Sequence, residues 1–233
     1  MTRLVPVLAL CAAVALGAVT TACTSTVGGV AVRAKGSVAA DDVPPIAESD
    51  LEGLLLSNGD LNKIAGVDME SFYSAEEMND NADLVSDVDC LGAVYPGEDA
   101  VYGDSDWRAV RDELLLEADG PDDAHLVEQT VVRFDTRDDA VDFFDMSKDS
   151  WNDCAKNKDI TVEGGGWVPD EVQEGNERLI SQKAKVSGTL NGICQHAMGV
   201  VSNVIVEGYS CDTDDHDDAQ EIARRILENA ADQ

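Results

Sequence analysis

Alternating apolar and polar residues in the middle of the chain predict two strands joined as a hairpin. Residues 107–117 alternate imperfectly, whereas residues 126–134 (LVEQTVVRF) are rich in β-branched side chains and give the clearer strand signal. The turn-forming run DGPD lies between them at residues 119–122. We therefore expect these two strands to pair antiparallel.

Two stretches with a helical period follow, one directly after the hairpin and one at the end of the chain. In each, apolar or small residues recur three or four positions apart, which is typical of a helix that buries one face. The first begins after Thr136 and carries on that face Ala140, Phe143, Phe144, Ser147, Trp151 and Cys154. The second begins near Asp217, an acidic start that suits the helix dipole, and carries Ala219, Ile222, Ala223, Ile226, Leu227 and Ala230.

Weaker patterns supply the remaining elements. Short helices are expected at residues 47–57, capped by Ser49 or Asp50, and at 60–65, between Asp60 as N-cap and Gly66 as stop, with a helical turn at 74–79. Further strands are expected at residues 160–162, 166–172, 179–186, 193–201 and 204–209. Because most connections between strands are short, this order favours an α+β fold, an antiparallel β-sheet with flanking helices packed on one face.

The N-terminal residues have the pattern of an export signal. Arg3 gives a positive start, an uncharged run extends from Leu4 to Val19, and Ala22 precedes Cys23. The run is too short and too rich in Ala and Gly for a permanent membrane span. Ala22–Cys23 indicates a bacterial lipoprotein acylated on Cys23, although Thr20 stands where a large aliphatic residue is usual. The alternative is cleavage nearby that leaves Cys23 unmodified.

Three segments follow from this pattern: a signal peptide at residues 1–22, a flexible tether at 23–46 that starts from the lipidated Cys23, and a folded domain at 47–233. The tether lacks aromatic residues and is too small and polar to order itself. We therefore expect the protein at the cell membrane, lipid-anchored, on the extracytoplasmic face. With 47 Asp+Glu against 16 Lys+Arg and a net charge of −31, the domain is not expected to bind nucleic acid, and it meets the membrane only through its anchor.

The six cysteines divide into Cys11 and Cys23 in the N-terminal segment and a remainder in the domain. The domain cysteines are Cys90, Cys154, Cys194 and Cys211. An even number of cysteines in an exported domain is typical of disulfide bonding. Since no C-x-x-C pair is present and the histidines do not cluster with the cysteines in sequence, a zinc site is not expected.

One disulfide follows from strand register. Ser202–Asn203 lies between two apolar runs as a plausible two-residue turn, which makes Val201 face Val204. Opposed residues in a hairpin have numbers with a constant sum, and Cys194 and Cys211 share that sum. They fall in a non-hydrogen-bonded pair, where side chains come closest. We therefore predict the pair Cys194–Cys211, and Cys90–Cys154 by exclusion.

Several fragments resemble, in sequence and in order, the PknH-like sensor-domain family, which comprises the extracellular sensor domain of a mycobacterial kinase and the lipoproteins that share it. These fragments are LLLSNGDLNKIAG, DVDCLGAVYPGE, VYGDSDWRAVRDELL, HLVEQTVVRF, DAVDFFDMSKDSWNDC and CQHAMGVVSNVIVEGYSC. The resemblance covers about residues 48–230 with all domain cysteines. It implies an antiparallel sheet with helices around a cleft, the same two disulfides and an unidentified ligand. His196 stands where the family often has Arg, and the loop at 212–218 is unusually acidic.

The candidate ligand-binding residues combine large aromatic rings with a few polar groups. They are Trp107, Arg111, Gln129, Trp151 and His196, with Trp167 as a further aromatic residue. Such a set suits a carbohydrate or a lipid headgroup, although packing alone also accounts for Trp151 on its helix stripe. We therefore expect a non-catalytic ligand-binding or sensing domain for an envelope glycan or lipid, without a cofactor or metal. Other envelope proteins are candidate partners.

Two other functions stay open. A cell-envelope hydrolase would use cleft carboxylates such as Asp112, Glu113 and Glu128 near His125, but with 47 acidic residues such proximity also arises by chance. An acidic cation-binding surface protein would use the loop at 212–218, which has five Asp in seven residues. The alternative, which we favour for that loop, is a solvated acidic helix start. No Gly-x-Ser-x-Gly, Walker or His-Glu-x-x-His motif occurs in the sequence.

Overall fold

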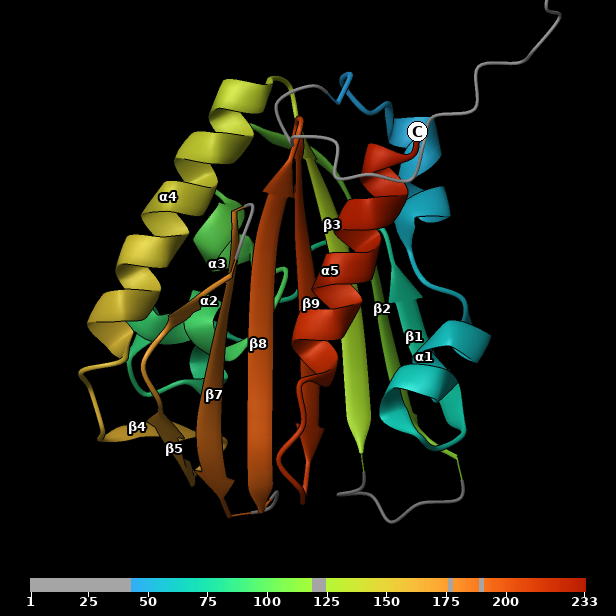
Figure 1. The fold of residues 1–233 in the computed structure, drawn as a ribbon. Coiled ribbons are helices and arrows are strands. Elements are labelled where there is room, and N and C mark those ends of the chain that lie inside the picture. Colours follow the sequence, from blue (N-terminus) through green and yellow to red (C-terminus); the bar gives the residue numbers. More distant parts are fainter. Residues whose placement is uncertain (1–42, 119–124, 176–177, 189–190) are drawn as a thin grey trace, which may run out of the picture. The chain divides into compact units, whose positions relative to one another are not determined.

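The computed structural model describes residues 43–118, 125–175, 178–188 and 191–233. Within these ranges the strands form one antiparallel sheet in the order β1-β2-β3-β9-β8-β7-β5-β4, with the short β6 beside β7 (Figure 1). The strands are β1 (Met69–Ala75), β2 (Trp107–Glu117), β3 (Leu126–Phe134), β4 (Ile160–Val162), β5 (Gly165–Pro169), β6 (Gln173–Glu174), β7 (Leu179–Ser187), β8 (Gly192–Val201) and β9 (Val204–Asp212). The predicted signal peptide, Cys23, most of the tether and the turn at 119–122 lie outside the described residues.

Along the chain, helices precede the first strand, connect strands in the middle and follow the last strand. They are α1 (Asn58–Ala65), α2 (Leu91–Val94), α3 (Asp99–Tyr102), α4 (Arg137–Cys154) and α5 (Asp218–Ala231), with 3₁₀ helices at Glu48–Leu54, Ala82–Leu84 and Val88–Cys90. The predicted α+β class and antiparallel sheet are confirmed. The long helix α4 begins after Thr136, whose hydroxyl accepts from the Asp139 backbone N–H in a capping box. Every residue of its predicted stripe is buried.

Helices cover both faces of the sheet, so the expectation that they pack on one face was wrong (Figure 1). One core lies between the sheet and α5, α1 and the first 3₁₀ helix, whereas the other lies between the sheet and α2, α3 and α4. The reason is visible in β3, where Val127 and Val131 enter the first core and Val132 and Phe134 enter the second. Because successive side chains of a strand point to opposite faces, a strand with apolar residues at both parities needs helices on both sides.

The N-terminal part of the domain differs most from the predicted elements. The predicted helical turn at 74–79 was wrong, because this region begins inside β1, which pairs with β2 at the edge of the sheet. Most β1 residues are exposed, so they lack the apolar alternation that reveals a strand. The cap assignments also shift by a few residues. Ser57, not Asp60, caps α1, although Gly66 ends it with φ 74° as predicted.

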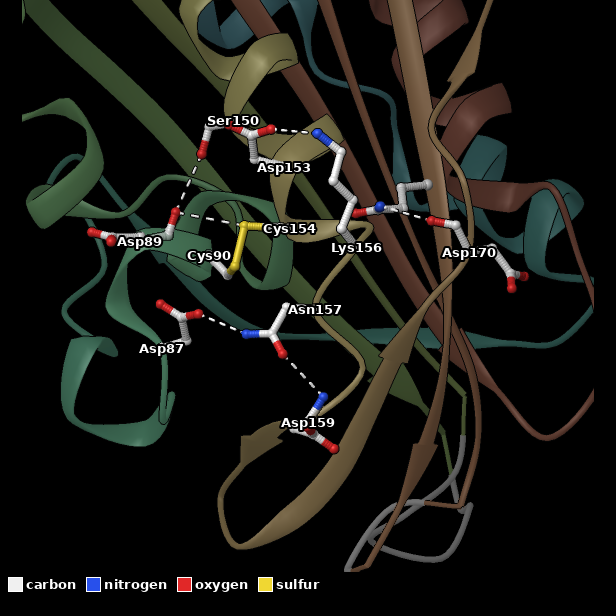
Figure 2. Close-up of a disulfide and its surroundings, with 11 residues drawn as sticks. Asp87, Asp89, Cys90, Ser150, Asp153, Cys154, Lys156, Asn157, Asp159 and Asp170 are labelled. Carbon is white, nitrogen blue, oxygen red and sulfur yellow. Dashed lines mark hydrogen bonds and ion pairs between the residues drawn. A yellow bond between two sulfur atoms is a disulfide. The ribbon is translucent and has the colours of Figure 1, made fainter.

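Both predicted disulfides are confirmed. In the hairpin of β8 and β9, Val201 faces Val204 and Cys194 faces Cys211, with a Cα–Cα distance of 4.0 Å. The second disulfide, Cys90–Cys154, joins a 3₁₀ turn to the last residue of α4. Figure 2 shows that Ser150 of α4 reinforces this link, since its hydroxyl donates to the Asp89 carbonyl oxygen at 3.2 Å. The segment before α2 is therefore fixed to α4 by both a covalent bond and a hydrogen bond.

Candidate functional site

Polar side chains replace apolar ones on the α4 side of the central strands. Because alternate residues of a strand share a face, Asp112 of β2, Glu128 and Thr130 of β3, Glu207 of β9 and His196 of β8 point toward the core that contains α4. Their exposed fractions are 1%, 6%, 0%, 1% and 2%. Asp112 pairs with Thr130, and Thr130 pairs with Glu207 across the neighbouring strand. We call these five residues the acidic patch.

Asp112 and Glu128 are joined by shared hydrogen-bond donors. The Tyr73 hydroxyl donates to Glu128 Oε1 at 2.9 Å, and Asn79 Nδ2 donates to the same oxygen at 3.1 Å. Asn79 Nδ2 also lies 3.4 Å from Asp112 Oδ2, while the Thr130 hydroxyl donates to Asp112 Oδ1. One amide therefore bridges two carboxyl groups that come from adjacent strands.

Burial makes this pair hold a proton more tightly than ordinary carboxyls do. Burial raises the pKa of Glu128 well above its usual range, and the negative charge of Asp112 raises it further. Burial also raises the pKa of Asp112, against the opposing effect of its hydrogen bond from Thr130. Since two adjacent carboxylates repel each other in a buried environment, the pair retains one shared proton more readily than it ionises fully.

His196 and Glu207 form the second half of the acidic patch. His196 Nε2 lies 2.8 Å from Glu207 Oε2, and His196 Nδ1 lies 3.3 Å from the Ala93 carbonyl oxygen. A carbonyl oxygen only accepts, so Nδ1 carries a proton and a further proton lies between Nε2 and the carboxyl group. Glu207 Oε1 also accepts from the Tyr102 hydroxyl at 2.7 Å and from the Gly97 N–H at 3.2 Å. The Glu207 carboxyl group thus holds together His196, the Tyr102 side chain and the backbone at Gly97.

The segment between β1 and α3 closes over the acidic patch. Asn79 N donates to the Gly97 carbonyl at 2.8 Å, and Asp99 N donates to the Asn79 carbonyl at 2.8 Å, so the two ends of the segment are tied together. Between them Glu98 is 1% exposed and accepts from Asn81 N at 2.8 Å and Asn81 Nδ2 at 2.6 Å. Burial raises the pKa of Glu98 as well. The segment therefore adds a further buried carboxyl next to the patch.

Of the candidate residues predicted from the sequence, the structure brings Trp151 and His196 together. Their ring centroids are 4.5 Å apart, and both are almost fully buried. Trp107 lies at the start of β2 and packs, partly exposed, against the same core. Trp167 of β5 is also buried there, and its indole Nε1 has no hydrogen-bond partner among the described residues. These aromatic residues therefore share one side of the sheet with the acidic patch.

Arg111 and Gln129 lie on the other side of the sheet, so the five candidate residues do not line one common surface. Arg111 Nη2 lies 3.3 Å from a Glu76 carboxylate oxygen. Gln129 is fully buried, accepts from the Leu56 N–H at 2.8 Å and donates to the Leu56 carbonyl at 3.0 Å. The Gln129 amide thus holds the chain before α1 against the sheet. Strand alternation explains the separation, because from Ala109 onward, after the bulge that follows Trp107, the odd-numbered residues of β2 and those of β3 point toward α5.

Sequence reasoning missed four members of this site. Tyr73, Asn79, Thr130 and Glu207 were not singled out, although a charged Glu207 inside the apolar run VIVEGYS is a detectable signal. Asp112 and Glu128 were considered for acid–base chemistry together with His125. The structure places His125 on the opposite face, near Asp212 and Asp218, so it does not join those two carboxyl groups.

The described residues supply two further findings. In these ranges, no group of three or more His, Cys, Asp or Glu side chains is arranged to hold a metal ion. Carboxylates of the loop at 212–218 instead contact cationic and histidine side chains, such as Lys183 with Asp215 and Asp217. None of the helices described here is long and apolar enough to cross a bilayer.

Comparison with known proteins assigns this fold to a family. The model of the PknH-like extracellular domain matches residues 46–229. The chain belongs to the PknH-like extracellular domain family. The resemblance seen in the sequence is thereby confirmed. The matched region is an extracellular domain, and it contains both disulfides and the acidic patch.

Relatives of this PknH-like chain are much longer. It is 32% identical over 189 residues to the serine/threonine-protein kinases PknH of Mycobacterium bovis and Mycobacterium tuberculosis, which covers 79% of this chain and 31% or 30% of theirs. The chain thus spans about three tenths of the length of the curated relatives that it matches. The crystal structure of the extracellular domain of PknH from M. tuberculosis matches with a TM-score of 0.74 and 29% identity, over 82% of this chain and 99% of that one.

Proposed function

We propose that this PknH-like domain is a non-catalytic ligand-binding or sensing module at the outer face of the cell envelope. The observation that carries the proposal is the acidic patch, whose ionisable side chains are buried beside a large apolar core. Buried ionisable groups add little net stability compared with apolar side chains of similar size. Their presence here, under a segment that contributes Asn79 and Glu98, therefore favours a role in recognition over a role in packing.

The chemistry of the patch selects a class of ligand. Carboxylates and amide oxygens accept hydrogen bonds from hydroxyl groups, and Tyr73 and Asn79 are partly exposed at the edge of the patch. Aromatic residues on the same side of the sheet, above all Trp107, supply apolar surface for a sugar ring. We therefore assign a hydroxyl-rich envelope molecule, a glycan or a glycosylated lipid headgroup, as the ligand.

The test measures thermal stabilisation of the purified protein by purified envelope glycans and by glycolipid headgroups. We expect at least one of them to raise the melting temperature of the wild type and to leave that of Asp112→Asn and Glu128→Gln unchanged. Glu70→Gln is the matched control, because Glu70 is an exposed carboxylate on β1. Absence of stabilisation by every compound refutes the proposal. Consumption of the compound by the wild type but not by Glu128→Gln supports the hydrolase instead.

The proposed location depends on Cys23, which precedes the folded domain by a short tether. Acylation of this cysteine would hold an acidic domain close to a membrane that its own charge does not attract. Growth with an alkyne-labelled fatty acid tests this. We expect the wild-type protein to be labelled and to sediment with membranes, and Cys23→Ala to lose the label and become soluble. A labelled Cys23→Ala protein, or an unlabelled wild type, contradicts lipid anchoring at this residue.

A further inference from the structure

His125 lies at the start of β3, on the face opposite the acidic patch, between two carboxylates. Its Nδ1 lies 3.5 Å from Asp212 Oδ2, and its Nε2 lies 3.3 Å from Asp218 Oδ2. Asp212 is the last residue of β9 and Asp218 is the first residue of α5. His125 is 3% exposed and Asp218 is 8% exposed, so water has little access to either side chain. One imidazole thus touches both ends of the connection between β9 and α5.

While His125 is neutral, one of its two contacts with carboxylate oxygens lacks a hydrogen-bond donor. A neutral imidazole has one N–H, whereas an ionised carboxylate can only accept. Whichever ring nitrogen carries the proton, the other faces a carboxylate oxygen without a donor between them. Among the described residues, His125 Nε2 and Asp218 Oδ2 are both buried and lack a hydrogen-bond partner. A second proton on His125 converts both contacts into charge-assisted hydrogen bonds.

A second histidine and a carboxylate lie next to His125. His216 Nε2 lies 2.8 Å from Asp212 Oδ2, and the rings of His125 and His216 stack at 5.8 Å and 15°. Burial disfavours the charge of Asp212, but the Thr213 backbone N–H and the positive charge of His125 outweigh it and lower the pKa of Asp212. Asp212 therefore stays ionised.

Two other carboxylates of the loop have partners on β7 and β8. Lys183 of β7 binds Asp215 and Asp217, and Gln195 of β8 donates to Asp217 Oδ1 at 3.3 Å. Hydrogen bonding to Lys183 lowers the pKa of Asp215. The loop carboxylates at 215 and 217 are thus satisfied by β7 and β8, which leaves Asp212, Asp218 and His216 as the groups that respond to His125.

We propose that protonation of His125 locks the connection between β9 and α5, and that its deprotonation releases this joint. Histidine ordinarily changes charge between about pH 5 and pH 8, so the lock responds to the acidity outside the cell. The locked state fixes the first turn of α5, the helix that packs against β8 and β9 on one face of the sheet (Figure 1). This proton switch is separate from the acidic patch and does not depend on the ligand proposed for it.

Hydrogen exchange of the wild-type protein and of His125→Gln tests the switch. The readout is protection of the backbone amides at residues 213–219, corrected for intrinsic exchange rates, at about pH 5.5 and about pH 7.5. In the wild type we expect protection to be roughly tenfold higher at the acidic pH, which matches the strength of buried hydrogen bonds to charged groups. In His125→Gln the pH difference should disappear. Asp214→Asn is the control, because Asp214 is an exposed carboxylate of the same loop, and it should behave like the wild type.

A second measurement needs no variant of the buried histidine. The chain has three histidines, so the ring ¹⁵N resonances of His125 can be assigned by elimination with His216→Gln and His196→Gln. We expect both ring nitrogens of His125 to be protonated at about pH 5.5 and one of them at about pH 7.5. A ring of constant protonation over this range, or loop protection that does not change with pH in the wild type, overturns the proposal.

Discussion

The hydroxyl of Tyr73 on the edge strand β1 donates at 2.9 Å to the carboxyl group of Glu128 on β3, reaching past the strand that separates them. This bond, together with the Asn79 amide, satisfies a carboxyl group that is 6% exposed. It also joins the sheet edge to the segment that closes over the acidic patch. Tyr73 therefore links the edge of the sheet to the polar part of its core.

Replacement of Tyr73 by Phe should destabilise the protein. The substitution keeps the ring but removes one donor from a buried carboxyl group, which costs about 1–3 kcal/mol. Urea denaturation followed by tryptophan fluorescence measures the free energy of unfolding. Tyr95→Phe is the control, since the described residues show no hydrogen bond from that hydroxyl. Equal losses in both variants would mean that the bond between Tyr73 and Glu128 contributes nothing specific.

The stability of the protein should depend on pH through Asp112 and Glu128. Burial raises both pKa values in the folded state above their unfolded values. Their contribution is therefore fully present below the unfolded pKa, near pH 4, and is lost as the pH rises through the folded pKa. Glu221 acts in the opposite direction, because hydrogen bonding to Arg224 lowers its pKa to about 2, so its contribution is present above its unfolded pKa and is lost as the pH falls toward about 2.

Glu128→Gln separates these contributions, because the amide mimics a permanently protonated carboxyl. We expect the free energy of unfolding of the wild type to fall, relative to that of Glu128→Gln, as the pH rises from about 5 to about 8. Urea denaturation at a series of pH values measures the difference. A difference that stays constant with pH would show that Glu128 does not titrate differently in the folded and unfolded states.

The two disulfides should differ in their effect on stability. Cys90–Cys154 closes a separation of 64 residues and Cys194–Cys211 one of 17. Loop-closure entropy then predicts losses of about 4 and about 3 kcal/mol when each pair is replaced by alanine. Chemical denaturation of the two double variants compares them directly. A larger loss from the shorter loop would indicate that packing around Cys194 and Cys211, not chain entropy, governs their effect.

Gly208 of β9 should tolerate no side chain. A Cβ atom there would lie 2.4 Å from the Ala219 carbonyl oxygen and 3.1 Å from the Ala223 nitrogen, both in the backbone of α5. Gly208→Ala must therefore push α5 off the sheet, which costs about 1–3 kcal/mol. Gly53→Ala is the matched control, because nothing lies within 4 Å of its added Cβ. Similar melting temperatures for the two variants would contradict the close approach of α5 to β9.

Strong local periodicity made much of the fold predictable. The bounds of β2 and β3 agree with the predicted strands. The predicted turn also placed Cys194 opposite Cys211, because the position of the turn determines which residues of a hairpin face each other. β1 was missed because an edge strand with exposed side chains has no apolar pattern. Local sequence therefore reveals an element only where that element has a buried face.

The candidate site was harder to predict than the fold. The sequence prediction placed Arg111 and Gln129 in one site with His196. In the structure they lie on opposite faces of the sheet, because successive residues of a strand point to opposite sides. The contacts of Asn79 with Glu128 depend on how a long irregular segment folds back over the sheet. No local pattern encodes that path. Glu207 alone carried a readable signal, a charge in an apolar strand.

The strand order determines when, during synthesis, the sheet can form. β3 finds its inner neighbour only in β9, so the hairpin of β2 and β3 has an open edge until β9 has been synthesised. α5, which follows β9 in sequence, must then pack on the apolar side that β8 and β9 share with it. The pairing of β3 with β9 is therefore a contact of large sequence separation, which is typical of slow folding. Truncation before α5 should yield an aggregation-prone product and not a smaller domain.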